Sequence, residues 1–246
     1  MPTWPLSDKL AEDRWAASCE LQVALWALNR SPCTVSVGES PHTRALTIWM
    51  DVPCPEGMQP AQQLARTRRF LRAHGVDGQA EFCAETYPRQ VLTFPTAADV
   101  WRLSAAIVGQ LSASHGARYR LSKAAYGIGI EWLSTVPYPM RPIIRPDDLS
   151  VGAAHRLCQA LAQRSPALTL ARVSEDEFAI EAVLNELKEA FSTAGVDMRL
   201  RRIGEGTVGF SCITPQAADQ LAELLTQHTR RMRAPLAAAV HGKEAS

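Results

Sequence analysis

Hydrophobic residues recur with two different periods in the first half of the chain, and together they predict a mixed α+β fold. Short stretches rich in β-branched and aromatic residues, bounded by proline or glycine, are typical of strands. Longer stretches with apolar residues every three or four positions predict helices. The predicted order is strand 45–52, helix 60–74, strands 79–85 and 90–94, helix 97–112, and a further strand within 117–133.

A repeat in the sequence extends this pattern to the second half. Gly75-Val76-Asp77 recurs as Gly195-Val196-Asp197, and the motif that starts at Pro95 recurs from Pro215, both with an offset of 120 residues. Matches in the same order without a gap favour an internal duplication. The second copy is expected to contain strand 167–173, helix 178–194, strands 198–203 and 207–213, helix 215–231, and a last strand within 236–241.

The β-α-β-β-α-β order builds an antiparallel sheet with both helices on one face. We therefore expect two tandem ferredoxin-like units, preceded by an additional helix at about 8–29. The expected divisions are residues 1–136 for that helix and the first unit, a proline-rich linker at 137–149, and residues 150–246 for the second unit with a basic C-terminal tail.

Composition is that of an ordinary globular protein. The 246 residues are 46% hydrophobic and 21% charged, with a formal net charge of +1, which excludes a disordered chain and a generally polycationic one. No apolar run is long enough to span a bilayer, and charged residues occupy the N-terminus where a signal peptide is apolar, so a cytoplasmic protein without a membrane partner is expected. The six cysteines lack zinc-ligand spacing, and neither a metal nor a cofactor is expected.

Positive charge is nevertheless concentrated locally. Helix 60–74 carries Arg66, Arg68, Arg69 and Arg72 without an acidic residue, whereas helix 178–194 is acidic. Strand alternation would place Arg118 with Arg120, and Arg199 with Arg201, on the open faces of the two sheets. Arg230, Arg231 and Arg233 follow near the C-terminus. These residues predict a surface for phosphate groups; the alternatives are a solvated helix face and salt bridges to the acidic helix.

Gly204, Gly206 and Gly209 form a G-x-G-x-x-G pattern. A strand follows it where a dinucleotide-binding site requires a helix, so we predict a hairpin turn, with a phosphate-contacting loop as the alternative. The sequence contains no nucleophile elbow, metalloprotease motif or P-loop.

Taken together, tandem ferredoxin-like units, the basic first helix, arginines on open sheet faces and the late glycine-rich hairpin resemble the RAMP superfamily, and within it the CRISPR repeat-processing endoribonucleases. The resemblance covers residues 45–231. It implies an RNA partner and metal-independent cleavage, in which a ribose 2′-hydroxyl attacks the adjacent phosphate. His74 or His42 would then be the base, and Arg30, Arg66 or Arg72 would stabilise the charge on the phosphate.

Three hypotheses about function follow. The first is an RNA-binding subunit of a ribonucleoprotein, with or without cleavage. The second is a non-enzymatic protein–protein interaction or scaffold module that uses the open sheet faces, with Trp4, Trp15, Trp26 and Trp49 as candidate anchors. The third is a small-ligand sensor at the interface of the two copies.

Overall fold

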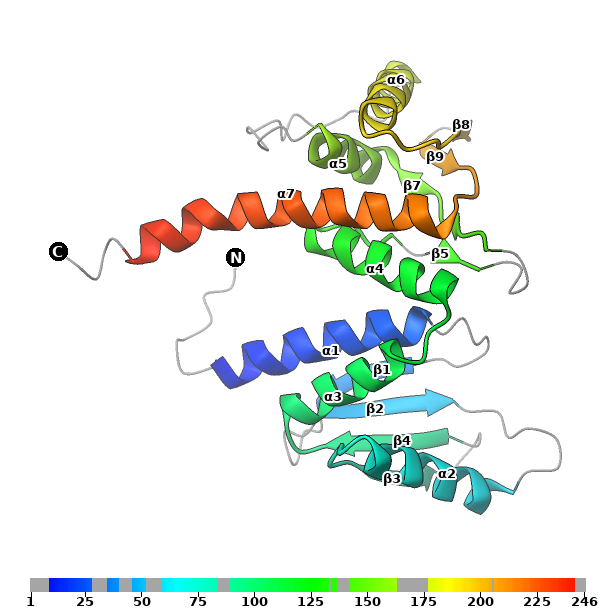
Figure 1. Ribbon diagram of the computed structural model, residues 1–246, viewed down its shortest axis with the longest axis vertical. Coiled ribbons are helices and arrows are strands. Elements are labelled where there is room, and N and C mark those ends of the chain that lie inside the picture. Colours follow the sequence, from blue (N-terminus) through cyan, green and yellow to red (C-terminus); the bar gives the residue numbers. More distant parts are fainter. Residues whose placement is uncertain are drawn as a thin grey trace. The chain divides into compact units, whose positions relative to one another are not determined.

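The computed structural model contains helices and antiparallel sheets, so the protein belongs to the α+β class (Figure 1). It describes residues 9–27, 35–39, 46–51, 59–83, 89–132, 134–136, 142–162, 177–204 and 206–241. The chain divides into two compact units, Met1–Leu111 and Ser112–Ser246. The division precedes the proline-rich segment 137–149, whose described residues pair with strands of the second unit.

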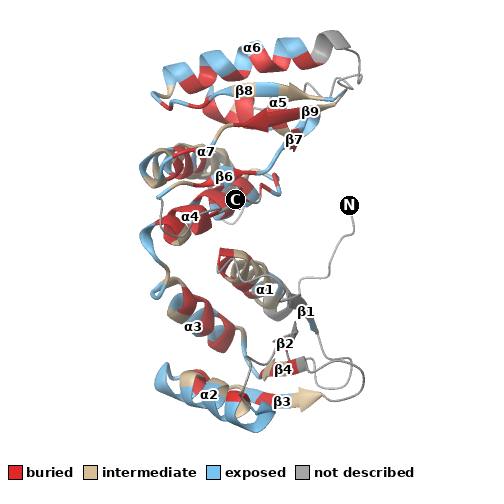
Figure 2. Ribbon diagram, turned by 90° about the vertical axis from the view of Figure 1, so that its right-hand side faces the viewer, coloured by how far each residue is buried: buried red, intermediate tan, exposed pale blue. Residues whose placement is uncertain are grey.

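The first unit contains one four-stranded sheet. Its elements are α1 (Lys9–Ala27), β1 (Val35–Glu39), β2 (Leu46–Asp51), α2 (Pro60–Ala73), β3 (Gln79–Cys83), β4 (Arg89–Phe94) and α3 (Ala97–Val108). All neighbouring strands are antiparallel, in the order β1-β2-β4-β3, so β3 forms one edge. Figure 2 shows α2 and α3 on the same side of the sheet.

The core of this unit lies between that sheet face and the helices. Leu46 pairs with Phe94, and Ile48 pairs with Leu92; all four are buried. Since strand side chains alternate between faces, these residues form one apolar surface. Val100, Leu103 and Ile107 of α3 are buried as well, and their spacing of three or four residues is that of a helix, which confirms the helix predicted from residue 97.

The second unit combines a three-stranded sheet with four helices. Its elements are α4 (Ala113–Gly127), β5 (Ser134–Thr135), β6 (Arg145–Pro146), β7 (Leu149–Ser150), α5 (Val151–Leu161), α6 (Glu177–Thr193), β8 (Leu200–Ile203), β9 (Thr207–Phe210) and α7 (Pro215–His241). The sheet order is β7-β9-β8, and β5 and β6 form a separate pair. Trp132, Phe191 and Phe210 pack together at its centre, with ring centroids 5.0 Å and 6.4 Å apart.

Two predicted strands are helical in the structure. The strand expected within 117–133 is wrong, because this segment contains most of α4: the Ser112 side chain caps the helix, and Ala117, Leu121, Ala124 and Ala125 form a buried helical stripe. The last strand, expected within 236–241, is also wrong, since α7 extends to His241. The strand expected at 167–173 lies outside the described residues. Strands β1 and β5–β7 had no counterpart in the prediction.

Helices α2 and α6 end in the same way. Gly75 and Gly195 adopt positive φ angles of 64° and 69°. In both, the glycine amide donates to a carbonyl three residues earlier, and the valine that follows donates to a carbonyl five residues earlier. Glycine is favoured here because a left-handed backbone strains other residues. The matching glycines in the sequence therefore have matching structural roles.

Candidate nucleic-acid interface

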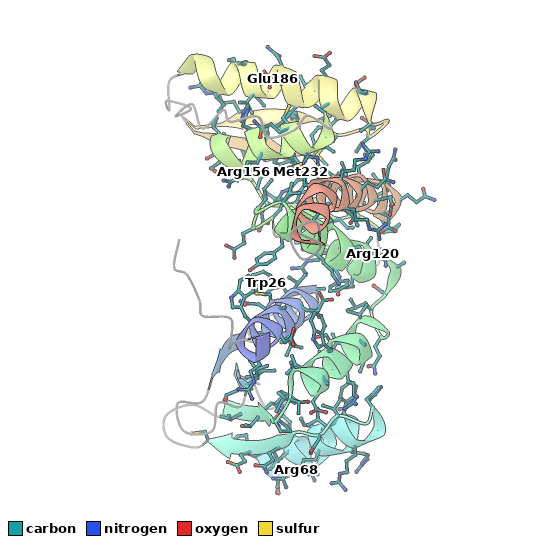
Figure 3. All side chains as sticks on the ribbon, turned by 90° about the vertical axis from the view of Figure 1, so that its left-hand side faces the viewer. Trp26, Arg68, Arg120, Arg156, Glu186 and Met232 are labelled. Atoms are coloured by element: carbon teal, nitrogen blue, oxygen red, sulfur yellow. The ribbon has the colours of Figure 1, made fainter. Side chains whose placement is uncertain are left out.

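Helix α2 buries one side of its surface and exposes arginine on the other. Gln63 and Leu71 are buried, and Phe70 is half-buried. The exposed residues Arg66, Arg68, Arg69 and Arg72 are called here the arginine face of α2. At 3.6 residues per turn, these side chains spread over about half of the helix circumference. Figure 3 shows Arg68 on this part of the first unit.

Within the described part of the chain, no acidic side chain makes an ion pair with the arginine face. α2 itself contains no acidic residue, and among the described residues Arg66, Arg69 and Arg72 have no ion-pair partner. Like charges at this spacing repel one another. An anionic partner that contacts several of these arginines would relieve the repulsion.

Arg68 differs from the other three because its guanidinium is attached to the sheet. Its Nε and Nη2 donate to the carbonyl oxygen of Ala80, at 3.1 Å and 2.7 Å. Ala80 belongs to the edge strand β3, so this carbonyl would otherwise face away from the sheet. An open groove lies beside this contact, lined by Arg68, Leu71, Arg72, Gly78 and residues 79–81.

Arg199 and Arg201 lie in the second unit, as the strand pattern predicted. Arg201 is opposite Gly209 in the β8–β9 register, while the neighbouring Leu200 is opposite the buried Phe210. Arg199 and Arg201 are exposed and lie on the sheet face opposite the core. A Cβ on Gly209 would collide with the Ile203 side chain and come within 3.1 Å of the Arg201 Cγ. Glycine at this position therefore leaves room for both side chains to lie over strand β9.

Arg118 and Arg120 do not lie on a sheet, and this placement corrects the prediction. Both belong to α4, because the segment that contains them is helical. Arg120 makes a two-point ion pair with Asp219 of α7, with Nε–Oδ1 at 2.7 Å and Nη2–Oδ2 at 2.9 Å. Its charge is therefore already matched within the second unit.

Arg118 is 6% exposed, and its Nη1 has no hydrogen-bond partner among the described residues. Burial lowers the pKa of Arg118 to about 10, and the nearby Asp147 carboxylate partly opposes this shift. Burial in turn raises the pKa of Asp147, while Arg118 acts in the opposite direction. Arg118 and Asp147 therefore interact with each other inside the second unit, and Arg118 is not part of an exposed cationic surface.

The glycine-rich segment is a hairpin turn between β8 and β9, which confirms the predicted geometry. Gly204 has a φ of 61°, and its carbonyl accepts a hydrogen bond from Arg202 Nε at 3.0 Å. The carbonyl of Gly206 accepts from the amide of Val151 at the start of α5. The turn therefore connects the sheet to α5.

The remaining candidates are dispersed. Arg230 and Arg231 are exposed on α7, and the side chain of Arg233 is outside the described part, as are Arg30 and His42. His74 is exposed at the end of α2, where its Nδ1 is 2.9 Å from the Phe70 carbonyl oxygen and its ring lies 4.3 Å from the Phe70 ring. Among the candidate aromatic anchors, Trp15 is 63% exposed.

Within the described residues, no cluster of three or more His, Cys, Asp or Glu side chains could hold a metal ion. None of the described helices combines the length and hydrophobicity that crossing a membrane requires. No protein-family model and no curated protein matches the sequence. The case for a function therefore depends on the geometry and charge of this chain.

Proposed function

We propose that the protein binds RNA and that the arginine face of α2 is its main contact. The observation that carries this proposal is the exposed half-circumference of cationic side chains on a helix without acidic residues. Phosphate groups provide most of the affinity of nucleic-acid binding, and arginine matches them through several donors. A protein of nearly neutral overall charge gains such affinity only from a local concentration of this kind.

The shape of the site supports an extended ligand. The groove beside Arg68 and Arg72 is open and more polar than apolar, unlike the concave apolar pockets that hold small molecules. α2 is packed on its sheet along one side, so only its outer half can meet a ligand. A-form RNA offers phosphates along a wide, shallow minor groove, and single strands offer them directly. Both present phosphates to a flat cationic surface.

We also propose that the two units are related ferredoxin-like copies. The order β2-β4-β3 in the first unit has the same form as β7-β9-β8 in the second, and the ends of α2 and α6 support the relationship. Three departures qualify the comparison. Strand β1 precedes β2 and takes the outer position beside it. Helix α4 follows α3 where a fourth strand would stand, and helix α5 lies between β7 and α6, where the first unit has no additional helix. A RAMP-like ancestry belongs to the same proposal.

RNA binding rather than cleavage is the activity that the described residues support. His74, the described histidine candidate, already uses its Nδ1 at the Phe70 carbonyl and packs against the Phe70 ring. A general base needs a nitrogen within reach of the substrate hydroxyl and a group that orients its ring. The Phe70 carbonyl can orient the His74 ring through Nδ1 and leaves Nε2 for a substrate, so cleavage by His74 stays a prediction and binding is proposed first.

Fluorescence anisotropy with a labelled oligouridylate tests the proposal. Each neutralised phosphate contributes about −0.7 to the slope of log affinity against log salt for a single strand, so four contacts would give about −3. Replacing all four arginines of the face by glutamine should flatten the slope and weaken binding. An affinity that does not change with salt, or a variant that binds like the parent, would overturn the proposal; a protein complex that survives nuclease treatment would favour a scaffold module.

A further inference from the structure

The groove between α2 and the edge of β3 divides the arginine face into two pairs. Arg68 and Arg72 line the groove, together with Leu71, Gly78 and residues 79–81. Arg66 and Arg69 do not line it. The four residues carry the same charge on the same helix, so the two pairs differ mainly in their surroundings.

Arg68 is held in place before any ligand arrives. Two of its N–H groups donate to the Ala80 carbonyl oxygen, and a guanidinium has five, so three donors stay available. An arginine on an open surface loses rotamer freedom when it binds a ligand. Arg68 has already lost part of that freedom in the folded protein, so its remaining donors are preorganised at the groove.

Arg72 follows Arg68 by one helical turn, which places both side chains on the same side of α2. Arg72 has no ion pair with a described residue. The guanidinium of Arg68 is fixed by the sheet, and that of Arg72 lies one helical turn away. Their N–H groups can therefore donate to one ligand in the groove from two directions. Tetrahedral phosphate groups accept such donors from more than one direction.

We propose that this groove is the seat of one phosphate group, held by Arg68 and Arg72. The proposal rests on the proposed function, because a phosphate of the RNA backbone is the expected occupant. Arg66 and Arg69 contribute to the general positive field and make no such seat. Free phosphate shares the same chemistry, and the experiments below separate the two sources.

Glu81 also lines the groove and acts against the ligand. Its carboxylate repels a phosphate group and competes for the donors of Arg68 and Arg72. The seat is therefore expected to bind one phosphate weakly by itself, and Glu81→Gln is expected to bind it more tightly. The expected result for Glu81→Gln is tighter phosphate binding. A variant that is merely misfolded would bind phosphate less tightly, so the two outcomes can be distinguished.

Titration of the full chain with inorganic phosphate tests the seat without RNA. The Nε–Hε resonances of the arginines are followed by NMR at constant ionic strength. Saturable shifts are expected for Arg68 and Arg72, with a lower apparent Kd in Glu81→Gln and no saturation in Arg72→Gln. Equal and unsaturated shifts at all four arginines would overturn the proposal, since they would indicate general screening.

Matched double variants test the seat with RNA. Arg68→Gln/Arg72→Gln and Arg66→Gln/Arg69→Gln remove the same charge, and the groove pair is expected to lose about tenfold in affinity, equal to about 1.4 kcal/mol, with a clearly smaller loss for the outer pair. Arg72→Gln alone repeats the comparison without removing the Arg68–Ala80 contact. Equal losses for the two pairs would overturn the phosphate seat while leaving RNA binding in place. Saturable phosphate shifts without any RNA affinity would support the seat, identify free phosphate as its source and overturn the proposed function.

Discussion

The 120-residue offset in the sequence aligns helices α2 and α6, which carry opposite charges on their exposed sides. With the offset of 120 residues, Arg66 corresponds to Glu186 and Arg69 to Glu189, and all four side chains are exposed. The buried ends agree, since Leu71 corresponds to the buried Phe191. The aligned positions therefore carry opposite charges on the exposed sides of the two helices.

The surfaces beneath the two helices also differ. Under α2, Thr67 donates to the Gln90 side-chain oxygen at 3.0 Å, and the buried Gln90 Nε2 has no partner in the described part of the chain. The corresponding positions in the second unit are Leu187 and Phe210, which are buried and apolar. An unpaired buried amide lowers stability, and the apolar residues at the aligned positions of the second unit avoid this cost.

Truncating the matched core residues should give the largest effect. Leu71→Ala is expected to cost about 2–5 kcal/mol and Phe191→Ala about 3–5 kcal/mol of unfolding free energy, because each leaves a cavity. Urea unfolding measures the loss, and hydrogen exchange shows which unit opens. Each variant should increase exchange mainly in its own unit; equal increases in both units for either variant would contradict the division at Leu111.

The matched helix-ending glycines should give the next largest effect. Gly75→Ala and Gly195→Ala should each destabilise by about 1–2 kcal/mol, since alanine is strained at positive φ. Gly152 in α5 is the control, because it has no positive φ and nothing within 4 Å of an added Cβ. Gly152→Ala should stabilise the protein by about 0.5–1 kcal/mol. Thermal unfolding measures the three variants, and equal signs for all of them would show that the positive φ does not determine the effect; opposite signs for Gly75→Ala and Gly195→Ala would show that the two helix ends are not equivalent.

Replacing Gln90 by an apolar residue should make the helix–sheet contact of the first unit resemble the apolar contact of the second. Gln90→Met removes a buried unpaired donor and should raise the unfolding free energy by about 1 kcal/mol, while Thr67 keeps its hydrogen bond to the Gln63 carbonyl. Thr67→Val is the opposite control, because it removes the partner of the Gln90 oxygen and should destabilise. Urea titrations of the two variants that move in the same direction would contradict this account of the polar contact.

Lowering the pH should destabilise the second unit through two histidines. This change in unfolding free energy is expected to be smaller than those of the variants above. Burial lowers the pKa of His115 and of His228 below 6.5, and Arg118 and Arg231 respectively add to this shift. As pH falls through the unfolded value of 6.5 toward the folded values, the unfolded state binds more protons and stability decreases. His115→Gln/His228→Gln should reduce this dependence in urea titrations between about pH 7.5 and 5. An unchanged pH slope would show that neither histidine contributes.

The sequence was sufficient to predict elements whose side chains follow one clear period. Helices α2, α3 and α6 and the hairpin β3–β4 lie close to their expected ranges, because each buries one face against the sheet. Segment 117–133 was misread because Arg118-Tyr119-Arg120-Leu121 alternates like a strand over a short window. The Ser112 cap and the alanines were the signals for a helix.

The site was only partly predictable for a related reason. The arginine face follows from the sequence of α2 alone, since its residues are local. The ion pair between Arg120 and Asp219 joins residues 99 positions apart, and no periodicity links them. The contact from Arg68 to the Ala80 carbonyl depends on which strand forms the sheet edge, which only the tertiary structure provides.

The most direct test of the central claim transfers the surface of α6 to α2. Arg66→Glu/Arg69→Glu installs the residues found at the corresponding positions of α6, and the salt dependence of its RNA affinity is compared with that of the parent chain. The account predicts that the slope of log affinity against log salt falls by at least about two phosphate equivalents, roughly 1.4 units, with thermal unfolding unchanged. A slope equal to that of the parent chain would contradict the claim that all four arginines of the face take part in binding RNA phosphates.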